Sequence, residues 1–140
     1  MAYCSQEDLL KMIPEEELAE ITSESGGIPD PAIVAEAIAQ ADSEIDVYCA
    51  VRYAVPFDPV PSLVKSLSVD VAAYHLYSRR SVAPEVRRQK YEDAITLLKA
   101  ISQGTAVLSM SSGVLTPNGR EVAELTSQPR QFSRSSLEKW

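Results

Sequence analysis

The chain has 140 residues and a mass of 15.3 kDa, which suits one domain large enough to bury its own hydrophobic core. Its 13 basic and 20 acidic side chains give a net charge of −7, which argues against a protein that wraps around nucleic acid, because phosphate contacts need a basic surface. Two cysteines and one histidine cannot make a Cys/His zinc site with four protein ligands, and no apolar run reaches the length of a membrane span.

The charge is distributed unevenly along the chain. Residues 1–46 carry twelve acids and one base, residues 47–103 five acids and eight bases, and residues 104–140 three acids and four bases. A solvated acidic face would explain this division, and so would head-to-tail association of the acidic part of one copy with the basic part of the next. The candidates for such charge contacts between subunits are Arg79, Arg80, Arg87, Arg88, Glu15, Glu16 and Glu17.

Two short helices are expected near the start of the chain. Ser5 can cap the first, and Asp8 three residues later completes a variant of the capping box. Pro14 ends this helix and begins the next, whose first turn carries three consecutive glutamates at the positive end of the helix dipole. Consecutive helical side chains point in different directions, so a solvated helix start is favoured over a cation site.

Three longer helices follow. Asp30 as cap and Pro31 as first residue start the strongest of them. The second is apolar most of the way round and is therefore expected to be central, and Gly104 is placed as the C-terminal cap of the third. The sequence thus predicts an all-α fold, a small bundle of about five helices. The long helices are expected at 31–54, 61–80 and 84–103.

The composition changes after residue 104, where serine, threonine, glycine and proline become frequent. We therefore expect a helical domain over 1–104, an extended C-terminal arm over 105–140, and a short β-hairpin at 106–116. A frayed terminus is the simple alternative to a docking arm, but large apolar side chains are costly to leave in water and serve as anchors on other chains. The candidate anchors are Arg130, Phe132, Arg134, Leu137 and Trp140.

The sequence offers only weak candidates for chemistry, and no catalytic residue, metal site or cofactor is assigned. His75 lies in the most apolar helix, and Asp70, five residues away, is poorly placed to orient it, so a core or interface histidine is expected. Cys4 and Cys49 could form a disulfide, act as reactive thiols or pack as apolar residues. An enzyme is not expected. The first residues lack a signal region, so a cytosolic, reducing setting is the default.

Several short segments occur in a characteristic order along nearly the whole chain. They include Glu7-Asp8-Leu9-Leu10, Glu16-Glu17-Leu18, Ala41–Tyr48, Val51–Phe57, Asp70–Tyr77 and Arg130–Arg134. In order and spacing they resemble the small virion protein of Mu-like phages and prophages, which is similar to the head-completion (head–tail connector) proteins of long-tailed phages. The resemblance is carried by order and spacing and not by any single motif.

This resemblance implies a structural role and no catalysis. Connectors of this kind form a ring, typically of about twelve subunits, beneath the portal protein. The ring extends the DNA channel and provides a platform for a tail-side stopper, terminator or tail protein, while C-terminal segments engage the portal or a neighbouring subunit. The implied location is the neck of the virion, with the host cytoplasm during assembly.

DNA is expected to pass through such a ring without specific binding. An acidic lining would prevent sticking, so part of residues 1–46 is expected to face the channel. The alternative is a small regulatory or host-interaction binding protein made by a prophage.

Overall fold

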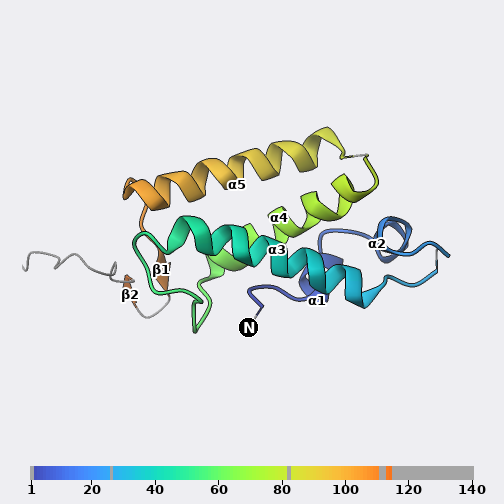
Figure 1. Cartoon of the computed structure of the whole chain (residues 1–140), viewed down its shortest axis with the longest axis horizontal. Helices are drawn as coiled ribbons and strands as arrows, with labels where there is room; N and C mark the ends of the chain where they lie inside the picture. Colours follow the sequence, from blue (N-terminus) through green and yellow to red (C-terminus); the bar gives the residue numbers. More distant parts are fainter. Residues whose placement is uncertain (1, 26, 82, 111–112, 115–140) are drawn as a thin grey trace, which may run out of the picture.

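The centre of the fold is a bundle of three long helices (Figure 1). The structure is a computed structural model, and it describes residues 2–25, 27–81, 83–110 and 113–114. The second helix runs antiparallel to both of the others, and all three pairs are in contact. These helices are α3 (Pro31–Cys49), α4 (Ser62–Arg79) and α5 (Glu85–Gln103).

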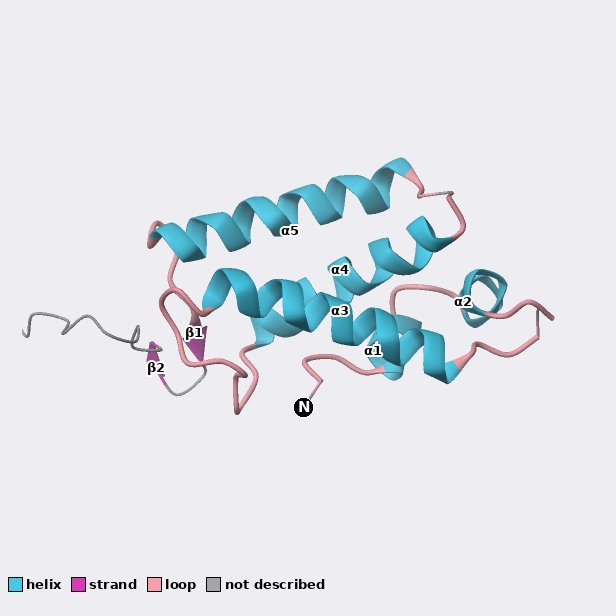
Figure 2. Cartoon of the chain, in the orientation of Figure 1, coloured by secondary structure: helices cyan, strands magenta, loops and turns pink. Residues whose placement is uncertain are grey.

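Two short helices complete the helical part. Helix α1 (Gln6–Leu10) packs against α3 and α4, and α2 (Glu15–Thr22) packs against α4 at one end of the long axis (Figure 1). Figure 2 shows that helices make up nearly all the regular structure of the described residues. The predicted all-α bundle of five helices is confirmed.

The predicted helix caps are present. Ser5 and Asp8 form the capping box of α1, and the Asp30 side chain accepts the Ala32 N–H at 2.9 Å at the start of α3. Gly104 ends α5 with φ of +84°, a left-handed conformation that suits glycine. A Cβ at this position would also lie 2.4 Å from Nη1 of Arg52, so the glycine makes room for that guanidinium.

Helix α3 ends at Cys49, five residues earlier than predicted. The Arg52 and Tyr53 amides both donate to the Cys49 carbonyl, at 3.0 and 2.8 Å, and this turn closes the helix. The chain can then bury Tyr53 and Phe57, whose rings lie 6.2 Å apart. Burial of these aromatic side chains therefore overrides the local helical pattern.

Helix α4 is central, as its apolar pattern predicted. Its fully buried side chains lie on several faces, because α1, α2, α3 and α5 all contact it. The small residues Ala41 of α3 and Ala72 and Ala73 of α4 are fully buried, which permits close approach of the two helices. Leu98 and Ile101 of α5 close the core on the remaining side.

The predicted hairpin is present, and it lies at the opposite end of the fold from α2 (Figure 1). Strand β1 (Ser109–Met110) pairs antiparallel with β2 (Gly113–Val114), inside the predicted range of 106–116. Leu108, just before β1, is fully buried, and its N–H donates to the Tyr53 hydroxyl at 3.2 Å. The packed unit therefore continues past residue 104 to at least Leu108.

Candidate interaction surfaces

Two of the arginines predicted to bind a neighbouring subunit bind within their own chain. Nη1 of Arg79 donates to the Ile21 carbonyl at 3.3 Å, and Nη2 of Arg80 donates to the Ser23 carbonyl at 3.1 Å. Both carbonyls lie at the C-terminal end of α2, where the helix dipole attracts cations. These contacts hold α2 against the end of α4.

A third arginine, Arg87, also serves an internal contact. Its Nη2 donates to the Met12 carbonyl at 2.9 Å, and its guanidinium carbon lies 5.7 Å from the centroid of the Tyr77 ring. The Tyr77 hydroxyl in turn donates to Glu17 at 2.5 Å. Burial and then this hydrogen bond raise the pKa of Tyr77 to about 12. Arg87 and Glu17 therefore both help to fasten the α1–α2 region to the bundle.

The remaining predicted charges are at the surface. Arg88 is exposed and pairs with Glu85 at 3.2 Å and with Glu92 at 3.8 Å, both on its own helix. Glu15 and Glu16 are exposed at the start of α2. The contact of these seven charged residues with a second subunit remains a prediction. Five of them already have partners within the chain: Arg79, Arg80, Arg87, Arg88 and Glu17.

A separate basic surface was not predicted from the sequence. Three of the chain's five lysines, Lys11, Lys65 and Lys90, line one cavity of about 370 Å³ between α1, α4 and α5, together with Asp8 and Asp70. Nζ of Lys65 lies 3.2 Å from Asp8, and Nζ of Lys11 lies 3.6 Å from it. Burial raises the pKa of Asp70, and the charge of Lys90 opposes this increase. The lysines come from three elements, so no local spacing could have revealed their convergence.

Asp8 is expected to contribute a measurable acid dependence of stability. Burial opposes its ionisation, but hydrogen bonds from Ser5 and Lys65 outweigh burial and lower its pKa to about 2. A carboxylate with a lowered pKa stabilises the fold above the unfolded pKa, and that stability is lost as the pH falls through the folded value. We expect Asp8→Asn to flatten the decrease in unfolding free energy between about pH 5 and pH 2.5 by about 1 kcal/mol, a figure reduced for solvent screening.

Urea unfolding at a series of pH values measures this effect. Asp58→Asn, at an exposed position, is the matched control. It should not change the slope of unfolding free energy against pH from that of the wild type. A slope for Asp8→Asn equal to that of the wild type would contradict the assignment.

The single histidine has an acidic partner that the sequence did not reveal. Nε2 of His75 lies 3.0 Å from Oε2 of Glu44, and the Tyr91 hydroxyl donates to Oε1 of the same carboxylate at 2.7 Å. The Tyr74 and Tyr91 rings stack with centroids 4.1 Å apart. Burial and the bond to Glu44 raise the pKa of Tyr91. This group ties α3, α4 and α5 together; within the described residues no hydroxyl or thiol is bonded to His75 that could act as a nucleophile.

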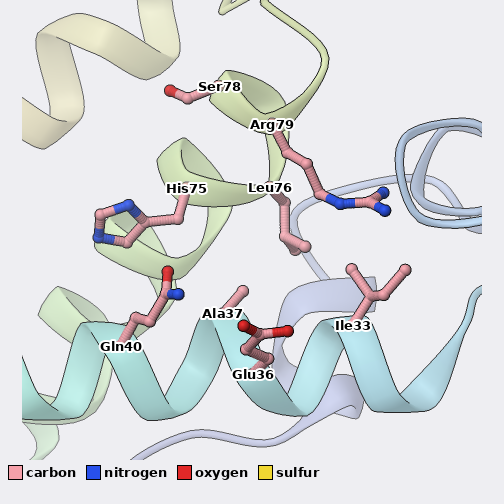
Figure 3. A pocket seen from close by; sticks show the side chains of 8 residues that line it. All are labelled: Ile33, Glu36, Ala37, Gln40, His75, Leu76, Ser78 and Arg79. Carbon is pink, nitrogen blue, oxygen red and sulfur yellow. The ribbon is translucent and has the colours of Figure 1, made fainter.

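A hollow of about 410 Å³ lies between α3 and α4, and His75 is one of the residues that line it (Figure 3). Glu36 and Gln40 line it from α3, and Arg79 and the apolar Leu76 line it from α4. In the part of the chain that the structure describes, no three His, Cys, Asp or Glu side chains are placed to hold a metal ion. The hollow is a polar recess without a metal-binding group among those residues.

The N-terminal segment is fastened by a buried polar cluster. The Tyr3 N–H donates to Asp42 at 3.0 Å, and the Ser68 hydroxyl donates to the same carboxylate at 2.7 Å. The Tyr3 hydroxyl donates to Asp46 and accepts the Phe57 N–H at 3.1 Å. Burial raises the pKa of Asp42, and the hydrogen bonds from the Ser68 hydroxyl and the Tyr3 N–H oppose this increase. One tyrosine thus joins the N-terminal segment, α3 and the link before α4.

Both cysteines are buried and carry no disulfide. Burial raises the pKa of Cys4 and of Cys49 to about 11, which keeps both thiols protonated near neutral pH. Of the three alternatives for these residues, the structure supports apolar packing.

The predicted docking anchors Arg130, Phe132, Arg134, Leu137 and Trp140 lie outside the described residues, so their role remains a prediction. Among residues 2–25, 27–81, 83–110 and 113–114, no helix combines the length and the apolar character needed to cross a membrane.

Comparison with known proteins bears directly on the resemblance. The family described as "Bacteriophage Mu, Gp36" matches residues 3–126. The chain is 30% identical over 137 residues to "Gene product J" of Escherichia phage Mu, covering 96% of each protein. It is 29% identical over 136 residues to "Mu-like prophage FluMu protein gp36" of Haemophilus influenzae, covering 96% of this chain and 94% of that protein. The chain therefore belongs to the Bacteriophage Mu Gp36 family of Mu-like phages and prophages.

Proposed function

We propose that the protein is a structural component of the virion, a head–tail connector that forms a ring beneath the portal. Membership of the Mu Gp36 family over residues 3–126 carries this proposal, together with the resemblance of that family to head-completion proteins. In this proposal the ring, of about twelve subunits, extends the DNA channel and offers a platform to a tail-side stopper, terminator or tail protein. No catalytic step is proposed.

Three features of the fold support a scaffold role. The α1–α2 region is fastened to the bundle by arginine contacts to backbone carbonyls, which makes a firm unit for assembly. Exposed glutamates at the start of α2 and a lysine-lined cavity elsewhere provide charges of both signs for contact between subunits. The acid-rich residues 1–46 suit a channel lining that DNA crosses without binding.

The C-terminal arm gives the first test of the proposal. We expect deletion of residues 127–140 to leave a folded helical protein that no longer joins the portal protein, because the arm carries the aromatic and arginine anchors. Circular dichroism measures the fold, and co-sedimentation with purified portal measures joining.

A full-length chain carrying Ser135→Ala and Ser136→Ala is the matched control and should still join the portal. Unchanged portal binding by the truncated chain would contradict the role of the arm, and loss of the helical signal would show that the arm is part of the fold.

A further inference from the structure

The lysine-lined cavity carries more positive charge than the chain itself neutralises. Lys11, Lys65 and Lys90 face two carboxylates, and a single one of these, Asp8, lies within 4 Å of both Lys11 and Lys65. The Lys11 side chain is 75% exposed and that of Lys65 is 50% exposed, so both ammonium groups are accessible. The apolar side chain of Met12, 41% exposed, borders the same cavity. Such a surface suits a partner that brings carboxylates and a little apolar area.

Helix α2 offers carboxylates that complement this surface. Glu16 and Glu20 are four residues apart on one helix face and are both exposed, and they line a hollow of about 760 Å³. Like charges at this spacing repel by a few tenths of a kcal/mol, a cost that an approaching cation removes. Within the described part of the chain no cation lies within 4 Å of either carboxylate, and residues 12–51 contain no lysine or arginine at all.

We propose that Glu16 and Glu20 of one copy dock on the Lys11, Lys65 and Lys90 cavity of the next copy, in a head-to-tail contact. This inference rests on the proposed function, and it names the two surfaces that join neighbouring subunits. The two patches differ, so each copy uses both, and repetition of such a heterologous contact closes into a ring when the rotation allows. In this contact the basic side of the interface is formed by the lysines. The arginines predicted for that role from the sequence, Arg79, Arg80 and Arg87, donate hydrogen bonds within their own chain.

A second copy fits this cavity better than a DNA backbone does. Two carboxylates, Asp8 and Asp70, line the cavity among the lysines and would repel successive phosphates. A helix face brings only two carboxylates, which can approach the three ammonium groups without a row of further negative charges beside them.

Cross-linking between two variants that each carry one added surface cysteine tests the contact. One preparation carries Ser66→Cys, at the rim of the lysine-lined cavity, and the other carries Gly27→Cys, beside Glu16 and Glu20, with an affinity tag; both positions are exposed and both substitutions keep the proposed contact charges. The native Cys4 and Cys49 are buried. We expect the concentrated mixture, treated with a short bis-maleimide, to give about tenfold more mixed dimer than either variant gives alone, because docking raises the effective concentration of the two thiols. The excess should disappear at about 1 M salt, where the Debye length falls to about 3 Å.

Lys99→Cys replaces Ser66→Cys as the matched control, because Lys99 is exposed on α5 and does not line the cavity. Equal yields from the Ser66→Cys and Lys99→Cys mixtures would overturn the proposal. So would a salt-dependent shift of duplex DNA that Lys65→Glu abolishes while cross-linking is absent.

A charge exchange keeps the proposal testable if a cysteine variant fails to fold. Lys65→Glu and Glu16→Lys chains should each associate poorly alone and should associate with each other in sedimentation velocity runs. Failure of this rescue overturns the docking pair even if imaging shows a ring at the virion neck. A virion without the chain would overturn the proposed function whatever the cross-linking shows.

Discussion

Replacement of Tyr3 by alanine is expected to lower the free energy of unfolding by about 4 kcal/mol, the range for truncation of a buried aromatic side chain. The ring is almost fully buried against Phe57, with centroids 5.8 Å apart. Its hydroxyl also accepts the buried Phe57 N–H and donates to Asp46, and truncation leaves both groups without this partner. Urea unfolding followed by circular dichroism measures the change.

Tyr3→Phe separates the hydroxyl from the ring. It should cost about 1–2 kcal/mol, because it removes one hydrogen bond to a charged group and one to a backbone amide. Tyr48→Phe is the matched control: Tyr48 is half-buried and its hydroxyl makes no hydrogen bond to another described residue, so a change within about 0.5 kcal/mol is expected. A Tyr3→Phe protein as stable as the wild type would show that the buried polar cluster does not hold the N-terminal segment.

Leu98→Ala is the second large effect, with an expected loss of about 3 kcal/mol. Leu98 is fully buried where α5 meets α3 and α4. The well-packed neighbours can only partly collapse into the space left by Cγ, Cδ1 and Cδ2 of the leucine. Chemical denaturation of purified protein measures the loss. Lys99→Ala, one residue along and exposed, should stay within about 0.5 kcal/mol, and equal effects of the two substitutions would contradict the described packing of α5.

The helices could be predicted from the sequence because their signals are local. Caps such as Ser5, Asp30 and Gly104 satisfy backbone groups within a few residues of themselves, and the structure has all three. The end of α3 was predicted too late, because it depends on where Tyr53 and Phe57 are buried, which is a tertiary effect.

The interaction surfaces were harder to predict, because they depend on contacts between distant parts of the chain. Glu44 and His75 are 31 residues apart, so the acid partner of the histidine could not be found by searching its own helix. The same holds for Arg79, whose partner carbonyl belongs to Ile21, 58 residues away. Local charge counting identified the acidic and basic regions but not which cations the fold itself uses.

The central claim, a connector ring, is tested most directly by a symmetry-resolved image of the neck of a virion that contains this protein. We predict a ring of this chain between portal and tail, with its bundle of α3, α4 and α5 in every subunit and acid-rich residues 1–46 lining part of the channel. A purified, complete virion whose neck lacks this chain would contradict the account and would favour a regulatory or host-interaction protein made by a prophage.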